Sequence, residues 1–206
     1  MFDQKMKMKR SLLYLFLIIP FLSNAQSIGI GEWEYHLSFT SAYTIAQNDE
    51  KVFVSSGSSV YTIDKENLET LDFNKLNALS DVGITCLAYD ESSEFLFIGY
   101  LNGNIDLVKD GETYNLGDIK RSNNIIGSKE IFDAFFKEDF IYVSTGFGLV
   151  VINLDKLEIT STSFLGENGS ETPVYSSLIK NDTLYAAAES GLFRIDYENP
   201  FIANYE

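Results

Sequence analysis

One phrase of 13 residues returns four times along this chain, and that repeat limits the fold more than any other feature. The copies read VFVSSGSSVYTID, LFIGYLNGNIDLV, IYVSTGFGLVVIN and LYAAAESGLFRID, beginning at Val52, Leu96, Ile141 and Leu184. They are spaced by 44, 45 and 43 residues, and an aromatic residue stands second in each. Alternating apolar runs on both sides of small turn residues predict a β-hairpin for each copy, with the turn positions at Ser59, Gly103, Gly148 and Gly191.

Further strands are predicted on both sides of most hairpins. The segments TIAQND, ITCLAYD, IFDAFFKED and SSLIKND precede the hairpins, and ETLDF, ETYNL and EITSTSF follow the first three. Four strands in a unit of about 44 residues is the period of a β-propeller blade. We therefore predict an all-β fold, a β-propeller of four-stranded antiparallel blades. About four blades are present as part of a larger ring, with units near 43–83, 84–130, 131–173 and 174–206.

Polar residues at the strand ends support this organisation. Asp64, Asn153 and Asp196 close the third strand of three units, where a short polar side chain can accept hydrogen bonds from nearby backbone amides. The Asp110–Gly111 pair predicts one more tight hairpin. Helical periodicity is nearly absent, and KENLETL and DFNKLNALSD predict one or two helical turns at most.

The first 25 residues have the pattern of a secretory signal peptide. Four basic residues between Lys5 and Arg10 precede an apolar run over 12–22 and the small residues Ser23-Asn24-Ala25. The prediction is a signal peptide at 1–25, a mature propeller domain at 26–206, and export through the inner membrane. No later stretch is apolar enough to span a bilayer, so no transmembrane segment is expected after cleavage.

The charge of the mature chain is strongly negative. Residues 26–206 hold 11 basic and 29 acidic residues, a net charge of −18. Such a surface repels nucleic acid and anionic membranes, so we expect no nucleic-acid partner. Lys120 and Arg121, in IKRSNN, form the one basic cluster that could meet a polyanion.

No catalytic, cofactor-binding or metal site is predicted, and no cofactor is expected. The only histidine, His36, lies in a strand-like run with Trp33 and is interpreted as a structural or surface residue. The only cysteine, Cys86, is interpreted as a buried inert thiol that cannot form an internal disulfide. DKENLE and DESSE offer oxygen ligands but match no EF-hand loop. GFG at 146–148 is interpreted as a hairpin turn. The acidic pairs Glu32 with Glu34 and Asp90 with Glu91 are expected by chance in so acidic a chain.

The repeat resembles the two-component-regulator propeller repeat, which residues 76–108 follow closely, with Ala78 where that family usually has glycine. A narrower resemblance is carried by IGEWEYHLSFTSAYTIA, LSDVGITCLAYD, NIDLVKDG, IKRSNNIIGSKEI and GFGLVVINLDKLEI. These phrases resemble the N-terminal propeller of the PorZ family of the type IX secretion system of Bacteroidota. Members have two propellers and a C-terminal β-sandwich, so the resemblance implies a truncated chain. Alternatively, GEWEYHLSF supplies the missing strand of a four-bladed ring.

The resemblance implies a non-catalytic component of the attachment complex, which would pass through the periplasm to the outer-membrane cell surface. Its partners would be the sortase and other proteins of that complex, together with anionic lipopolysaccharide, which it would deliver to the sortase and bind through regions absent from this chain. Two alternatives stay open at this point: a periplasmic ligand-sensing propeller of a hybrid two-component regulator, and an exported carbohydrate-active propeller enzyme. The second requires residues converging on a central channel, and none can be identified from the sequence.

Overall fold

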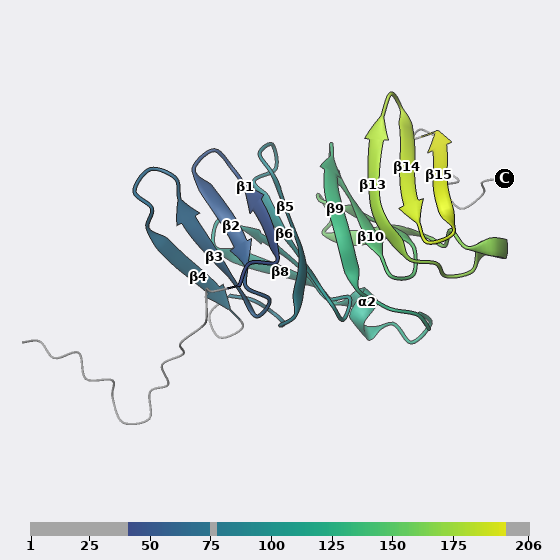
Figure 1. Ribbon diagram of the computed structural model, residues 1–206, viewed down its shortest axis with the longest axis horizontal. Helices are drawn as coiled ribbons and strands as arrows, with labels where there is room; N and C mark the ends of the chain where they lie inside the picture. Colours follow the sequence, from purple (N-terminus) through teal and green to yellow (C-terminus); the bar gives the residue numbers. More distant parts are fainter. Residues whose placement is uncertain (1–40, 75–77, 197–206) are drawn as a thin grey trace, which may run out of the picture. The chain divides into compact units, whose positions relative to one another are not determined.

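The computed structural model describes residues 41–74 and 78–196. The predicted signal peptide at 1–25 and the residues Glu32, Trp33, Glu34 and His36 lie outside these ranges, as does the segment GEWEYHLSF. Within them, the chain forms four separate antiparallel sheets that follow one another in the sequence (Figure 1). The predicted all-β fold is confirmed.

The first two sheets each have four strands in chain order. The first contains β1 (Thr44–Gln47), β2 (Lys51–Ser55), β3 (Ser59–Asp64) and β4 (Thr70–Asn74). The second contains β5 (Ile84–Asp90), β6 (Phe95–Tyr100), β7 (Ile105–Lys109) and β8 (Glu112–Leu116).

The third sheet again has four strands, and the fourth has three within the described residues. The third contains β9 (Ile131–Lys137), β10 (Phe140–Thr145), β11 (Leu149–Asn153) and β12 (Glu158–Ser163). The fourth contains β13 (Val174–Lys180), β14 (Thr183–Ala188) and β15 (Gly191–Asp196). The short helix α2 (Asp118–Arg121) and the 3-10 turn η2 (Glu167–Gly169) lie in the connections on either side of the third sheet.

The four repeated phrases form the hairpins β2–β3, β6–β7, β10–β11 and β14–β15, as predicted. Asp110 and Gly111 have φ of 52° and 81°, the left-handed backbone that a two-residue hairpin turn requires. In the first hairpin the left-handed residue is Gly57 (φ 89°). Ser59, the predicted turn position, is instead the buried first residue of β3, because the loop over residues 56–58 reverses two residues earlier, at Gly57.

The middle sheets are buried on both faces, because successive side chains of a strand point to opposite sides. On β6, Leu96 and Ile98 pack in a cluster with Phe53 of the first sheet. Phe97, between them, packs in a second cluster with Ile141 of the third sheet. This arrangement explains why the central hairpins are mostly apolar. In a sheet with one solvent-exposed face, apolar and polar residues would alternate along each strand.

The first strands of consecutive sheets lie next to each other: β1 contacts β5, β5 contacts β9, and β9 contacts β13. The Oγ1 of Thr85 on β5 donates to the carbonyl oxygen of Ile131 on β9 at 2.7 Å. In β5, β9 and β13 the second residue has no paired residue on the following strand, although the residues on either side of it do. These residues, Thr85, Phe132 and Tyr175, are bulges that increase the local twist where one sheet meets the next.

Of the two segments predicted to form one or two helical turns at most, KENLETL contains a single turn over residues 65–67, within that limit. Part of DFNKLNALSD lies outside the described residues. Asp64 and Asn153 accept the expected backbone hydrogen bonds, from the amides of Glu66 and Lys156 at 2.9 Å each. Across 41–74 and 78–196, no helix is long and apolar enough to cross a membrane.

Candidate interaction face

The hairpin turns between second and third strands lie at the same end of the sheets as the connections from one sheet to the next. We call this end the loop face, and it comprises residues 56–58, 78–83, 101–104, 117–130, 146–148, 164–173 and 189–190. Backbone hydrogen bonds join its segments: the amides of Gly83 and Ile84 donate to the carbonyl oxygen of Gly57, and the amide of Leu101 donates to that of Gly83. These backbone hydrogen bonds help to hold the loops in place.

A buried carboxylate lies beneath this face in the second sheet. Asp106, on β7, has no exposed surface. Its oxygens accept hydrogen bonds from the Tyr100 hydroxyl at 2.7 Å, the Ser80 amide at 2.8 Å and the Asn115 side chain at 2.8 Å. Burial, and next the Asp106 charge, raise the pKa of Tyr100, so its hydroxyl stays a donor. Three donors compensate the cost of burying the charge, and they tie the loop at residue 80 to β6, β7 and β8.

A second carboxylate, Asp81, joins three loop-face segments. It accepts from the Nζ of Lys120 at 2.5 Å, from the Asn102 side chain at 2.8 Å and from the backbone amide of Val82 at 3.0 Å. Its side chain is 7% exposed. Burial alone would raise the pKa of Asp81, but the hydrogen bonds from Lys120, Asn102 and Val82 outweigh it and lower the pKa to about 2. Asp81 is therefore ionised at every physiological pH.

The predicted basic cluster is engaged within the chain. Lys120 binds Asp81, and Arg121 pairs with Asp118 at 3.0 Å. The ammonium group of the nearby Lys129 donates to the carbonyl oxygens of Lys120 and Ser122, at 3.0 and 2.6 Å. These cations stabilise the connection from β8 to β9, and none of the three is a free site for a polyanion.

Several large apolar side chains of this region are exposed. Leu101, at the tip of the β6–β7 turn, is 57% exposed, and Val82 beside it is 49% exposed. Ile126, in the connection to β9, is 94% exposed, and Tyr43, which packs next to Gly57, is 72% exposed. Apolar side chains presented on rigid loops suit contact with another protein surface.

Cys86 and Asp90, for which no catalytic or metal-binding role is predicted, lie within the described residues. Cys86 is a free, buried thiol on β5, and burial, followed by the Asp133 charge, raises its pKa to about 12. Asp90 accepts hydrogen bonds from Ser92 and Ser93 within its own turn instead of converging with other ligands. Across the described ranges, no group of three or more side chains could hold a metal ion. GFG at 146–148 forms the β10–β11 turn, as predicted.

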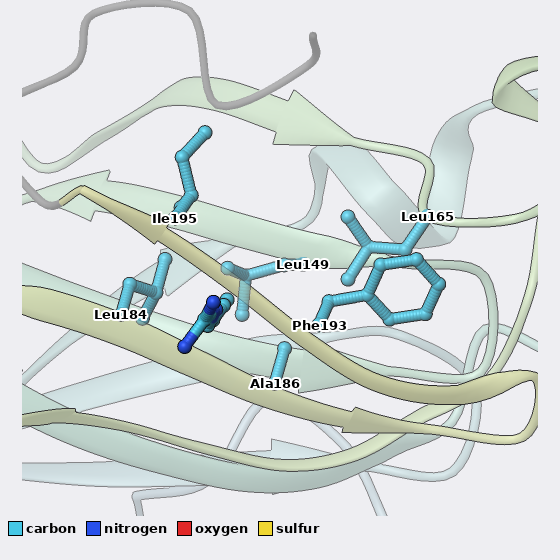
Figure 2. A pocket seen from close by; sticks show the side chains of 7 residues that line it. Leu149, Leu165, Leu184, Ala186, Phe193 and Ile195 are labelled. Atoms are coloured by element: carbon cyan, nitrogen blue, oxygen red, sulfur yellow. The ribbon is translucent and has the colours of Figure 1, made fainter. Parts of the chain in front are cut away.

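One small apolar cleft lies between β11 of the third sheet and the β14–β15 hairpin of the fourth (Figure 2). Its volume is about 20 Å³, room for about one water molecule. Leucine, isoleucine, alanine and phenylalanine side chains line it almost entirely, at Leu149, Leu165, Leu184, Ala186, Phe193 and Ile195. A cleft of this size and composition has no arrangement of acid, base or nucleophile that could carry out a reaction.

Sequence reasoning missed the links centred on Asp81 and Asp106. The only signal was indirect, because Asp81, Asp106 and Lys120 stand in three of the phrases that carried the resemblance, LSDVGITCLAYD, NIDLVKDG and IKRSNNIIG. The structure brings these three phrases together at one end of the second sheet.

Antiparallel sheets of up to four strands, repeated along the chain and packed one on the next, define a β-propeller domain. More narrowly, the chain belongs to the family described as the type IX secretion system PorZ N-terminal beta-propeller domain, which matches residues 52–202. No curated protein sequence matches the chain.

Among solved structures, the chain is similar to PorZ of Porphyromonas gingivalis, which is described as an essential bacterial surface component of the type IX secretion system. The identity is 26% and the TM-score 0.66, over 77% of this chain and 21% of PorZ. The chain therefore spans about a fifth of the length of that protein.

Two further structures share the fold. They are extracellular domains of the putative hybrid two-component systems BT4673 and BT3049 from B. thetaiotaomicron. The first is 12% identical with a TM-score of 0.60, over 73% of this chain and 20% of that one. The second is 17% identical with a TM-score of 0.59, over 80% of this chain and 22% of that one.

Proposed function

We propose that this chain is a non-catalytic component of the type IX secretion system that works in the attachment complex at the cell surface. There it helps to deliver anionic lipopolysaccharide to the sortase that processes and anchors secreted cargo. The observation that carries the proposal is membership of the PorZ N-terminal propeller family over residues 52–202. Export by the signal peptide at 1–25 to the cell surface is part of the same proposal.

Within that role, this domain binds protein and not lipopolysaccharide. The loop face supports this division, because Lys120, Arg121 and Lys129 are engaged by carboxylates and carbonyl oxygens of the chain itself. Phosphate or carboxylate groups of a lipopolysaccharide would therefore meet cations that already interact with oxygen atoms of the chain itself. The exposed Val82 and Leu101 give a protein partner an apolar contact on a fixed backbone.

The two-component sensor has weaker support. Its relatives are 12% and 17% identical to this chain, a likeness that shows the fold alone, whereas the secretion-system relative is 26% identical. Shared β-propeller architecture does not transfer a signalling role.

The proposal is tested by deleting the gene in the bacterium that carries it and measuring how much secreted cargo is processed and attached to the surface. We expect unprocessed cargo to accumulate and the wild-type gene to restore attachment. Normal cargo processing in the deletion strain would refute the secretion role.

Co-purification of the sortase tests the loop face. Leu101→Asp places a charge in the apolar contact and should lower sortase recovery about 10-fold, the size of a single interface hot spot. Leu68→Asp is the matched control, since Leu68 is 72% exposed and lies in the β3–β4 turn, outside the loop face. Equal loss in both variants, or no loss in either, would exclude the loop face as the docking surface.

A further inference from the structure

A groove with a volume of about 500 Å³ opens between the first and second sheets, at the end opposite the loop face. Its wall is partly aromatic, because Phe53 and Tyr89 stack with ring centroids 5.5 Å apart. Leu71, which is 64% exposed, also lines it. The volume lies within the range of natural ligand sites.

The rim of this groove is acidic. Five carboxylates and two lysines line it, a net charge of −3, and they come from the β1–β2, β5–β6 and β7–β8 turns and the adjoining strands: Asp49, Glu50, Glu91, Glu94, Asp110, Lys51 and Lys109. Among residues 41–74 and 78–196, the carboxylates of Asp49, Glu50, Glu91 and Asp110 have no ion-pair or hydrogen-bond partner. A concave groove with a partly aromatic wall concentrates such a negative field.

The lysines near the groove do not neutralise it. Lys51 lies opposite Asp64 on the neighbouring strand, so the Asp64 carboxylate offsets the positive charge of Lys51. Lys109 donates to the carbonyl oxygen of Ser93 at 2.9 Å and lies 5.3 Å from the centre of the Phe95 ring. Glu94 is within 3.9 Å of the same ammonium group, so one of the five carboxylates already has a cation.

These turns already bind cations of the chain itself. Lys65 donates to the carbonyl oxygen of Asn48 in the β1–β2 turn at 2.5 Å, and Lys109 makes the equivalent contact with Ser93 in the β5–β6 turn. Lys109 combines a carbonyl oxygen, a carboxylate and an aromatic ring around one ammonium group. The open groove offers unpaired carboxylates and an aromatic wall, and the two lysines that line it, Lys51 and Lys109, already face Asp64 and Glu94.

We propose that this groove binds a basic segment of a partner protein, with an arginine side chain placed between the aromatic wall and the free carboxylates. Arginine fits this setting better than lysine, because its flat guanidinium can stack on Tyr89 and still donate to carboxylates at its edge. The described residues contain no cluster that could hold a metal ion, and the carboxylates belong to three separate turns, which favours an extended ligand over a single ion. The proposal does not depend on the secretion role, because it concerns a different end of the sheets.

The test measures binding of a synthetic peptide, Gly-Arg-Gly-Arg-Gly, to the purified full chain by isothermal titration calorimetry. The same peptide with citrulline in place of arginine keeps the shape and removes the charge. We expect the arginine peptide to bind and the citrulline peptide not to. The double variant Glu91→Gln with Asp110→Asn should weaken binding about 10-fold, the sum of two charge-assisted contacts.

The control variant is Glu167→Gln with Glu189→Gln, which makes the same change in net charge at exposed positions on the loop face. Circular dichroism of both variants checks that they fold. Photo-cross-linking of the peptide to the unmodified chain gives a readout without mutation, with labels expected in residues 48–50, 89–94 and 108–111. The proposal would be overturned if both variants weakened binding equally or if the cross-links fell elsewhere in the chain. It would also be overturned if spermine bound as tightly as the peptide, or if the peptide did not bind at all.

Discussion

Replacing Asp81 by asparagine tests whether the ion pair between this buried carboxylate and the partly exposed Lys120 holds the loop face together. The pKa of Asp81 is lowered from 3.8 to about 2 in the folded chain, and its side chain is 7% exposed. A shift of that size corresponds to about 2 kcal/mol of folding free energy. Because the folded-state pKa lies below the unfolded value, the ionised form stabilises the fold. The contribution is complete above about pH 5 and is lost as the pH falls toward 2.

The assay is urea unfolding of the wild type and of Asp81→Asn at a series of pH values. At pH 7 the variant should be less stable by about 2 kcal/mol, and the difference should shrink as the pH falls toward 2. Asp155→Asn, a change at an exposed carboxylate, is the control and should show no such dependence. A difference of constant size from pH 7 to pH 3 would refute the reasoning, because it would trace the loss to packing and not to the charge.

Three further predictions concern the core and turns. The Cys86 thiol, buried and with its pKa raised to about 12, should react with a thiol reagent only when the chain unfolds, and rapid labelling at pH 8 would contradict its burial. Gly103→Ala should lower the melting temperature more than Gly111→Ala: both glycines have φ near 80°, but only at Gly103 would a Cβ meet neighbours, with Ile119 at 2.6 Å. Phe97→Ala, at a fully buried position, should cost about 3–5 kcal/mol in urea unfolding, and a cost under about 1 kcal/mol would mean that the two middle sheets are not packed as described.

Much of the fold could be predicted because its information is local. Each hairpin needs alternating apolar residues and a permissive turn within about 13 residues, and the chain repeats that pattern four times. The error at Ser59 shows the limit of this reasoning. Aligning the repeats places the turn by analogy, whereas the backbone reverses where a residue can adopt positive φ, at Gly57.

The candidate sites were less predictable, because their residues meet only after the strands pair. Lys120 was singled out as a basic residue that a polyanion could meet, but its partner Asp81 stands 39 positions earlier and no local pattern connects the two. The groove between the first two sheets combines turns that are about 20–60 residues apart in sequence. A single sequence shows that such residues are polar, and it does not show which of them will be close together.

By itself, the sequence determined the all-β class, the four hairpins and the repeat that makes the chain a propeller, since strand periodicity and turn chemistry act over a few residues. Only the tertiary structure decided which charges are paired and which are free. Burial and distance set the pKa of Asp81, engage Lys120 and leave Glu91 and Asp110 without partners among the described residues. Electrostatic interactions depend on distance in space and on exposure to water, and both are fixed only when the sheets pack against one another.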